Sequence, residues 1–457
     1  MSTDIFCSIF KGSRTVFIPM ASVAILSMYS LSSYAGSDGN ESNPLDAITV
    51  IGSQAVEKAE IGGTPVKDLP MNVHVVGEDE VERLRFVDPN ELLDRIPGET
   101  QVRNLRIPDG GKGYTIPMVD GIPLESPYEG ATQRIDRVNT ADIQRVEVIK
   151  GPASAIYPSN ALGGVINVVT KDAPIKPEGE IWYEGGDFNR RRFGVNTGGS
   201  AGKVGYFIDI NSRSLDGLRD DVKNDRDQFS GKFIFDATET TRIVTRVERL
   251  EEDVVSRADL TEAEIAENPR QSGGNDSSED LSQDAFFVKL EQLFDSSNLD
   301  VSFSYREKDT IGTSRFSGPQ NENDEGINTK ILYRYDFDNS NLITGFENYT
   351  GKQHTLQYAR NDDALSGPFD TIDSELDINA YFAQYEFRPA QRLGITLGVR
   401  HENIDIESFS DNANDSSGSA SFSDTSPKLG FTYDLSANNR LWLSLSEVIF
   451  FISHQVN

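Results

Sequence analysis

Apolar and polar residues alternate one by one through much of the second half of the chain. Between 299 and 306, the apolar side chains of Leu299, Val301 and Phe303 are separated by polar ones. Because side chains alternate across a β-strand, each such segment has one apolar and one polar face. The same period recurs at 206–211, 331–337, 395–400, 429–433 and 441–445. The pattern predicts an antiparallel sheet of amphipathic strands.

Two kinds of protein share this alternation, soluble β-sandwiches and transmembrane β-barrels. The barrel is favoured by segments approaching the roughly 9–11 residues of a tilted membrane strand, and by Tyr and Phe near strand ends. Short turns also alternate with long polar connections, as in bacterial barrels. We expect the long connections at 251–283, 307–326, 360–375 and 407–424. The second half is interpreted as an antiparallel transmembrane β-barrel with about a dozen strands.

A different pattern occupies the region from about 64 to 170. Its second expected helix has a complete start, since Asp88 can cap it, Pro89 suits its first turn and Glu91 can complete a capping box. Helices are expected at 78–85 and 88–96, and strands at 73–76, 118–123, 146–152 and 165–170. This mixture predicts a compact α/β domain that ends near residue 173.

The amino terminus has the three parts of a secretory signal peptide. Lys11 and Arg14 precede an apolar stretch at 15–31, and a small-x-small triplet ends at Ala35. We expect cleavage after that triplet, with a membrane anchor as the alternative. Cys7 is the single cysteine and lies in this segment, so the mature chain would hold no disulfide. No later run approaches the roughly 20 apolar residues of a helical membrane span.

Composition excludes several classes of function. The chain has 43 basic and 73 acidic residues, a net charge of −30, which disfavours nucleic acid because phosphates are bound by Lys and Arg. Its four histidines show no metal-ligand spacing, and no nucleophile motif or nucleotide-binding signature is present. We therefore expect no enzyme, no catalytic residue, no resident metal and no cofactor.

The stretch Ile143–Lys171 resembles the plug signature of TonB-dependent outer-membrane receptors. It contains Ile-Gln-Arg-Val-Glu-Val-Ile-Lys-Gly-Pro and then Leu-Gly-Gly-Val-Ile-Asn-Val-Val-Thr-Lys. Glu91–Gly98 and Val119–Pro123 are similar to the same plug in order and spacing, and Ser426–Gly430 with Leu443–Ser446 resembles a pair of barrel strands. The signature positions are Asp120, Gly121, Glu147, Lys150, Gly151, Gly163 and Gly164.

The resemblance implies an α/β plug domain followed by a β-barrel that has 22 strands in the family. It also implies a monomer in the outer membrane of a Gram-negative cell, in contact with lipid and lipopolysaccharide. Its ligand would be scarce, a ferric siderophore by default, with cobalamin, heme or a glycan as alternatives. On this basis residues 1–35 are the signal peptide, 36–60 a flexible leader, 61–173 the plug and 174–457 a partial barrel.

A short apolar island follows the leader's polar start. The resemblance implies that Ile48, Thr49, Val50 and Ile51 form the TonB box, which the TonB complex of the inner membrane engages. An extended segment on a flexible leader can add as a strand to a partner's sheet. The alternative is that these residues are merely the first plug strand or a linker.

Three features depart from the family pattern. Lys150 stands where an Arg that pairs with barrel carboxylates is common, so a latch between plug and barrel should be weaker or differently built. Pro158 stands where Gly is common. After Glu447 the sequence no longer resembles the family, which predicts a carboxy-terminal truncation by a frameshift or premature stop and leaves a non-functional remnant as an alternative.

Overall fold

The structure of the chain is a computed structural model. It describes residues 60–61, 64–65, 70–84, 89–96, 115–124, 135–151, 157, 161, 163–257, 260–271, 277–313, 318–359, 368–412, 417–436 and 439–447. The predicted signal peptide, the TonB box, Pro158 and the stretch after Glu447 all lie outside these residues.

Short elements come first along the chain and long strands follow. The elements before residue 173 are β1 (Glu60–Ile61), β2 (Thr64–Pro65), β3 (Asn72–Val76), α2 (Glu78–Leu84), α3 (Pro89–Leu93), β4 (Thr115–Val119), β5 (Ile122–Pro123), the 3-10 helices η4 (Ile135–Arg137) and η5 (Thr140–Asp142), β6 (Ile143–Lys150) and β7 (Gly164–Thr170). After them come β8 (Glu178–Gly185), β9 (Arg191–Ala201), β10 (Val204–Asp216), β11 (Lys223–Asp236), β12 (Thr241–Ser256), α5 (Glu262–Glu267), β13 (Ser277–Phe294), β14 (Ser297–Thr313), β15 (Pro319–Asp336), β16 (Ser340–Gln357), β17 (Asp370–Ala390), β18 (Leu393–Ser410), β19 (Gly418–Ser436) and β20 (Asn439–Ser446). Within the described ranges, no helix combines the length and apolarity that a membrane crossing requires.

The first region forms a five-stranded sheet in the order β3-β6-β7-β4-β5. β4 runs parallel to β7, and the other neighbours are antiparallel. The register places Ile166 of β7 opposite both Val148 of β6 and Pro117 of β4. The strands and helices expected in this region are confirmed to within a few residues, so it is the predicted α/β domain.

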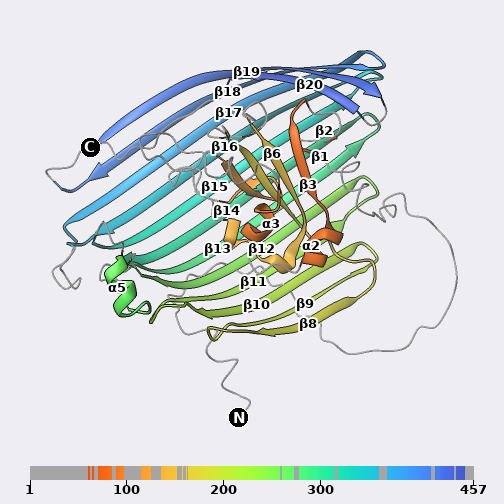
Figure 1. Ribbon diagram of the computed structural model, residues 1–457. Coiled ribbons are helices and arrows are strands. Elements are labelled where there is room, and N and C mark those ends of the chain that lie inside the picture. The colour runs from red at the N-terminus through yellow and green to blue at the C-terminus, as the bar shows by residue number, and fades with distance from the viewer. Residues whose placement is uncertain are drawn as a thin grey trace, which may run out of the picture. The chain divides into compact units, whose positions relative to one another are not determined.

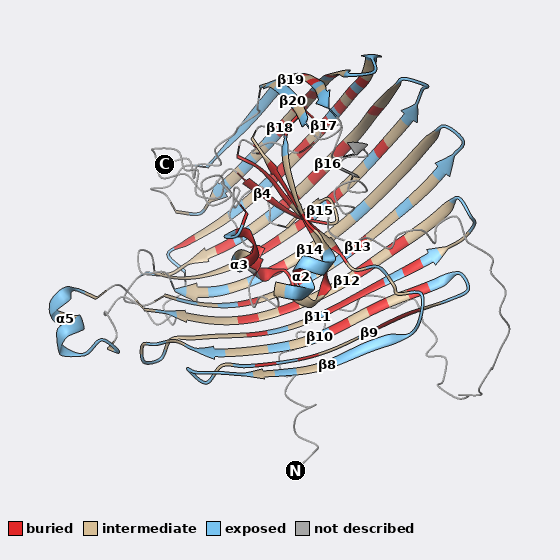
Figure 2. Cartoon of the chain, turned by 45° about the vertical axis from the view of Figure 1, so that its right-hand side comes forward, coloured by how far each residue is buried: buried red, intermediate tan, exposed pale blue. Residues whose placement is uncertain are grey.

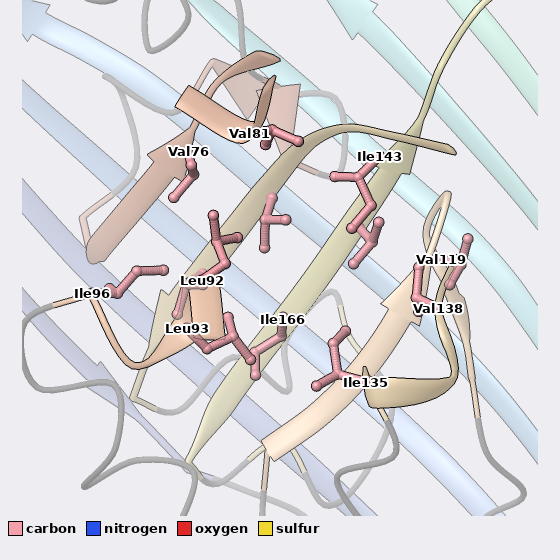
Figure 3. Close-up of a cluster of buried hydrophobic side chains, with 13 residues drawn as sticks. Val76, Val81, Leu92, Leu93, Ile96, Val119, Ile135, Val138, Ile143 and Ile166 are labelled. Carbon is pink, nitrogen blue, oxygen red and sulfur yellow. The ribbon is translucent and has the colours of Figure 1, made fainter. Parts of the chain in front are cut away.

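Apolar side chains hold this domain together on one face of its sheet. Figure 3 shows Val76, Leu92, Leu93 and Ile166 pointing toward one another between the strands and the short helices. Leu93 is fully buried and Leu92 nearly so, because α3 turns the two apolar residues at its end inward. Burial of each such side chain contributes about 1.5–3 kcal/mol.

The second region is a sheet of 13 described strands, each paired with its sequence neighbours in antiparallel fashion. Figure 1 shows β8 to β20 side by side in chain order. The expectation of an antiparallel sheet with about a dozen strands is confirmed. We call strands β8 to β20 the long sheet.

The two faces of the long sheet have opposite characters. Asp209 on β10 is fully buried, whereas the next residue, Ile210, is 48% exposed. On β18, Arg400 is buried and Leu397 is 46% exposed. Figure 2 shows the buried positions spaced along the strands. A soluble sandwich would bury the apolar face instead, so this arrangement fits a sheet whose apolar face contacts lipid.

The connections are shorter than expected, and the strands are longer. The stretch between β14 and β15 spans 314–318 instead of the expected 307–326, and part of the expected connection at 251–283 is the helix α5. Polar side chains pair across the strands in these extensions, as Lys308 does with Glu322 (3.5 Å). Cross-strand pairs of opposite charge stabilise strand pairing outside an apolar environment. The alternation of apolar residues therefore could not reveal how far these strands extend.

Candidate functional site

The Asp120–Gly121 turn joins β4 to β5 through left-handed backbone. Asp120 has φ +49° and Gly121 φ +82°. The Asp120 carboxylate accepts hydrogen bonds from the backbone N–H (2.9 Å) and the hydroxyl (2.6 Å) of Thr170 on β7. Burial alone would raise the pKa of Asp120, but the charges of Lys232 and Arg246 and the bonds from Thr170 hold that pKa below its ordinary value. The turn is therefore fixed to β7 by a carboxylate that stays ionised.

A second chain of hydrogen bonds links the same turn to β6. The Gly121 N–H donates to the Asn167 side-chain oxygen (3.0 Å), and the Asn167 amide donates to Glu147 (2.9 Å). Arg145 donates to the other oxygen of the Glu147 carboxylate (2.8 Å). Glu147 is fully buried, so these bonds compensate the loss of its hydration. The structure thus brings Asp120, Gly121 and Glu147 together.

The remaining signature residues form the junction of β6 and β7. Lys150 ends β6 opposite Gly164, and the Gly151 N–H donates to the Gly163 carbonyl (3.0 Å). Gly151 and Gly164 have φ +91° and +131°. A Cβ on Gly164 would lie 1.9 Å from the Ile149 carbonyl oxygen, so only glycine fits there. These residues shape the plug backbone at this junction.

Arg137, in η4, forms an ion pair between the first domain and the long sheet. Its guanidinium is 2.7 Å from Glu279 on β13 and 3.7 Å from Glu252 on β12, and its side chain is 3% exposed. Gln228 on β11 donates to the Arg137 carbonyl (2.7 Å). The sequence predicted an altered latch because of Lys150, and the structure shows an ion-paired attachment at Arg137.

A carboxylate pair lies next to this attachment. Asn139 caps η5 and also donates to Asp209 of β10 (2.6 Å), while Ser230 of β11 donates to Asp142. Burial and the charge of Asp209 raise the pKa of Asp142 to about 7, although Arg246 and the bond from Ser230 act in the opposite direction. Ser230 lies opposite Asp209 in the pairing of β10 with β11, so the two buried carboxylates are neighbours across the boundary between the first domain and the long sheet.

Asp172, at the end of the first domain, is held by two cations of the long sheet. Its two carboxylate oxygens lie 2.8 Å from Lys232 and 2.8 Å from Arg242. Lys232 also donates to the Thr170 carbonyl (3.2 Å). The side chain of Asp172 is 47% exposed; its partial burial would raise its pKa, but the charges of Lys232 and Arg242 lower that pKa below the ordinary value. This carboxylate is a third attachment between the two regions.

A small cavity lies between the Asp120–Gly121 turn and strands β12 to β14. Its volume is about 70 Å³, and Asp120, Ile122, Arg246, Gln283 and Arg306 are among its lining residues. Pockets for drug-sized ligands are about 300–1,000 Å³, so this space cannot hold an iron chelate. Within the described residues, no group of three or more metal-ligating side chains converges.

Sequence reasoning missed the residues that join the two regions, among them Arg137, Asn139, Asp142, Asp209, Arg246, Glu252 and Glu279. One pattern could have found some of them. On β12, Arg246 and Glu252 have the same parity as the buried Val244 and Leu250. Charged residues at inward positions of an amphipathic strand must be paired, which marks them as contacts to another element.

Comparison with known families now decides the class. Residues 65–165 match the TonB-dependent receptor plug domain, and residues 183–449 match the TonB-dependent receptor-like β-barrel. The chain belongs to the TonB-dependent receptor family. It is an outer-membrane protein of this family, with a plug domain followed by a barrel sheet. The family is one of transport receptors. In this chain, the residues that join the plug to the long sheet form the candidate functional site.

Similar proteins include receptors of known structure. The alcaligin outer-membrane receptor of Bordetella pertussis aligns with TM-score 0.67 and 16% identity over 84% of this chain and 64% of that one. The ferric yersiniabactin uptake receptor of Yersinia pestis aligns with TM-score 0.68 and 17% identity over 83% and 64%. A vitamin B12 transporter of Photobacterium profundum is 25% identical over 168 residues, 34% of this chain and 27% of the transporter. The chain thus spans less than two thirds of these proteins.

Proposed function

We propose that this receptor takes up a scarce ligand across the outer membrane by an energy-dependent movement of the plug. The observation that carries the proposal is the pair of buried polar contacts between plug and long sheet at Arg137 and Asp142. Breaking a buried ion pair costs about 3–5 kcal/mol, so a plug held in this way needs an external source of work to move. The TonB complex of the inner membrane is the source that the family uses.

In this proposal the TonB complex engages residues 48–51 on a leader that spans 36–60. Residues 1–35 are the cleaved signal peptide, 61–173 the plug and 174–457 the part of the barrel in this chain. The alternating apolar pattern of Ile48 to Ile51 supports this role, because an extended strand can pair with a partner's sheet edge. The exposed apolar face of the long sheet supports contact with lipid and lipopolysaccharide around a monomer.

A ferric siderophore is the ligand that we propose. The similar receptors of known structure are described as receptors for alcaligin and for ferric yersiniabactin, which supports an iron chelate. The match to a vitamin B12 transporter supports cobalamin as the second candidate.

A single substitution separates binding from energised uptake. Val50→Pro removes a backbone N–H and prevents strand pairing of the box, so uptake should be lost while binding to cells remains. Gly39→Pro, in the leader outside the box, is the matched control and should retain uptake. The probes are radioactive iron as hydroxamate, catecholate and citrate chelates, and radiolabelled cyanocobalamin, given to cells that lack their own receptors for these ligands.

Three results bear directly on this proposal. Uptake that persists in Val50→Pro would remove the role of the box. A chain that reaches the outer membrane but binds none of the probes would contradict the proposed ligand class. Uptake of cyanocobalamin alone would replace the siderophore by the second candidate.

A further inference from the structure

Two buried carboxylates at the boundary between plug and long sheet each have one oxygen without a hydrogen-bond partner in the described part of the chain. One oxygen of Asp142 accepts from Ser230, and one oxygen of Asp209 accepts from Asn139 (2.6 Å) and Asn211 (2.9 Å). The other oxygens, Oδ1 of Asp142 and Oδ2 of Asp209, accept no hydrogen bond from the residues that the structure describes. Asp142 is 2% exposed and Asp209 fully buried, so these oxygens are shielded from solvent.

The surrounding charges do not neutralise both carboxylates. From β12, Arg246 lies 3.9 Å from Asp142, but the same guanidinium is 2.5 Å from Glu248, which adds a negative charge near Asp142. From the plug, Lys171 acts on Asp209 at longer range. The neighbours from β10 and β11, Asn211 and Ser230, are neutral. Two adjoining carboxylates in such a site cannot both remain ionised at low cost.

One proton lowers this cost. Bound to one of the two partnerless oxygens, it removes one negative charge and the repulsion between the two carboxylates. A metal ion would need several oxygen ligands, whereas the amide and hydroxyl groups here already donate to the carboxylates. We propose that Asp142 and Asp209 share one proton across the boundary between plug and long sheet, and that this proton fastens η5 to β10.

The seating of the plug is then linked to proton binding. When η5 leaves β10, the two carboxylates separate, gain water and release the shared proton. Because the pKa of Asp142 is raised to about 7 in the seated plug, the stability of seating depends on pH. A carboxyl whose pKa is higher in the seated plug contributes stability below its ordinary value, and that contribution is lost as pH rises through about 7. Seating should weaken as the pH rises from about 4 to about 7 and should change little above that.

Hydrogen exchange of the full chain in detergent micelles can test this proposal. The observed amides are those of η5 and of Lys171, whose N–H donates to the Asp142 carbonyl (2.7 Å). After correction for intrinsic exchange, their protection should fall by up to about tenfold per unit as the pH rises toward about 7, and should level off above that. In Asp142→Asn the amide replaces the protonated carboxyl, so the fall should disappear. Asp209→Asn should have the same effect and covers the case in which the first variant does not fold.

Asp172→Asn is the matched control, because Asp172 is also an acidic group between plug and sheet but its pKa is held low by Lys232 and Arg242. This variant should lower protection yet keep the response near pH 7. An unchanged pH response in both Asp142→Asn and Asp209→Asn would overturn the proposal. Restoration of protection at about pH 8 by millimolar Ca²⁺ would also overturn it, since a cation would then occupy the place of the proton.

Discussion

At the scale of single residues, Asp120 combines two properties that few residues share. It tolerates the left-handed backbone of the turn, at φ +49°, and its carboxylate accepts two hydrogen bonds from Thr170. The same carboxylate faces Lys232 and Arg246 of the long sheet. Backbone conformation, strand attachment and the balance of charge beside the sheet therefore depend on one side chain.

Replacing Asp120 should separate these contributions. Asp120→Ala loses both hydrogen bonds, the tolerance of positive φ and the charge facing two cations, and should destabilise the plug by about 3–5 kcal/mol. Asp120→Asn keeps one acceptor oxygen and tolerates the turn, so its loss should be about 1–3 kcal/mol. Exchange of the Thr170 amide measures both. Equal losses in the two variants would show that neither the remaining acceptor nor the backbone tolerance matters.

At the scale of elements, the junction of β6 and β7 depends on a close approach of backbone to backbone. At Gly164 a side chain is excluded both by the positive φ and by contact with the Ile149 carbonyl oxygen. At Gly121 only the positive φ disfavours a side chain, because nothing lies within 4 Å of a Cβ placed there. The two glycines therefore distinguish steric contact from backbone strain within one domain.

Alanine at these glycines should have unequal effects. Gly121→Ala should cost about 1–2 kcal/mol, the price of left-handed backbone. Gly164→Ala adds a contact with the Ile149 carbonyl oxygen and should cost about 2–5 kcal/mol in all. Denaturant unfolding of the plug, followed by hydrogen exchange of β7 amides, gives both values. A Gly164→Ala variant no worse than Gly121→Ala would mean that β6 moves aside without cost.

The sequence was sufficient to predict that the strands and helices exist, but not which residues of the plug and the long sheet contact one another. The period of two in β10, β14, β15, β18, β19 and β20 was readable because each strand has one apolar face. In contrast, Arg137 and Glu279 are 142 positions apart, and no local rule brings them together. The ends of the long strands were misjudged because their cross-strand pairs are polar.

At the scale of the whole described molecule, attachment of plug to sheet rests on buried charge at Arg137. A double-mutant cycle between Arg137→Met and Glu279→Gln should give a coupling energy of about 1–3 kcal/mol. Hydrogen exchange of the η4 amides measures the four variants. The matched control is Lys223 with Asp253, an ion pair within the long sheet whose side chains are 38% and 45% exposed. Its cycle should give less than about 1 kcal/mol, and a larger value there than at Arg137 would contradict the assignment.

The two sides of the plug are attached in different ways. Ion pairs and hydrogen bonds join it to β10 through β13, beside a small apolar contact of Ile122 with strands β11 to β13. On the other side, Met71, Ile116 and Val165 pack against Leu332, Ile343 and Phe382 of β15 to β17. A hydrogen bond weakens steeply when its geometry is disturbed, while apolar contact is non-directional and survives sliding. We expect a small displacement of the plug to begin with its apolar side sliding along β15 to β17 while its polar side stays attached to β10 through β13. Added salt should weaken the polar contacts with β10 through β13 and leave the apolar contacts with β15 to β17 almost unaffected.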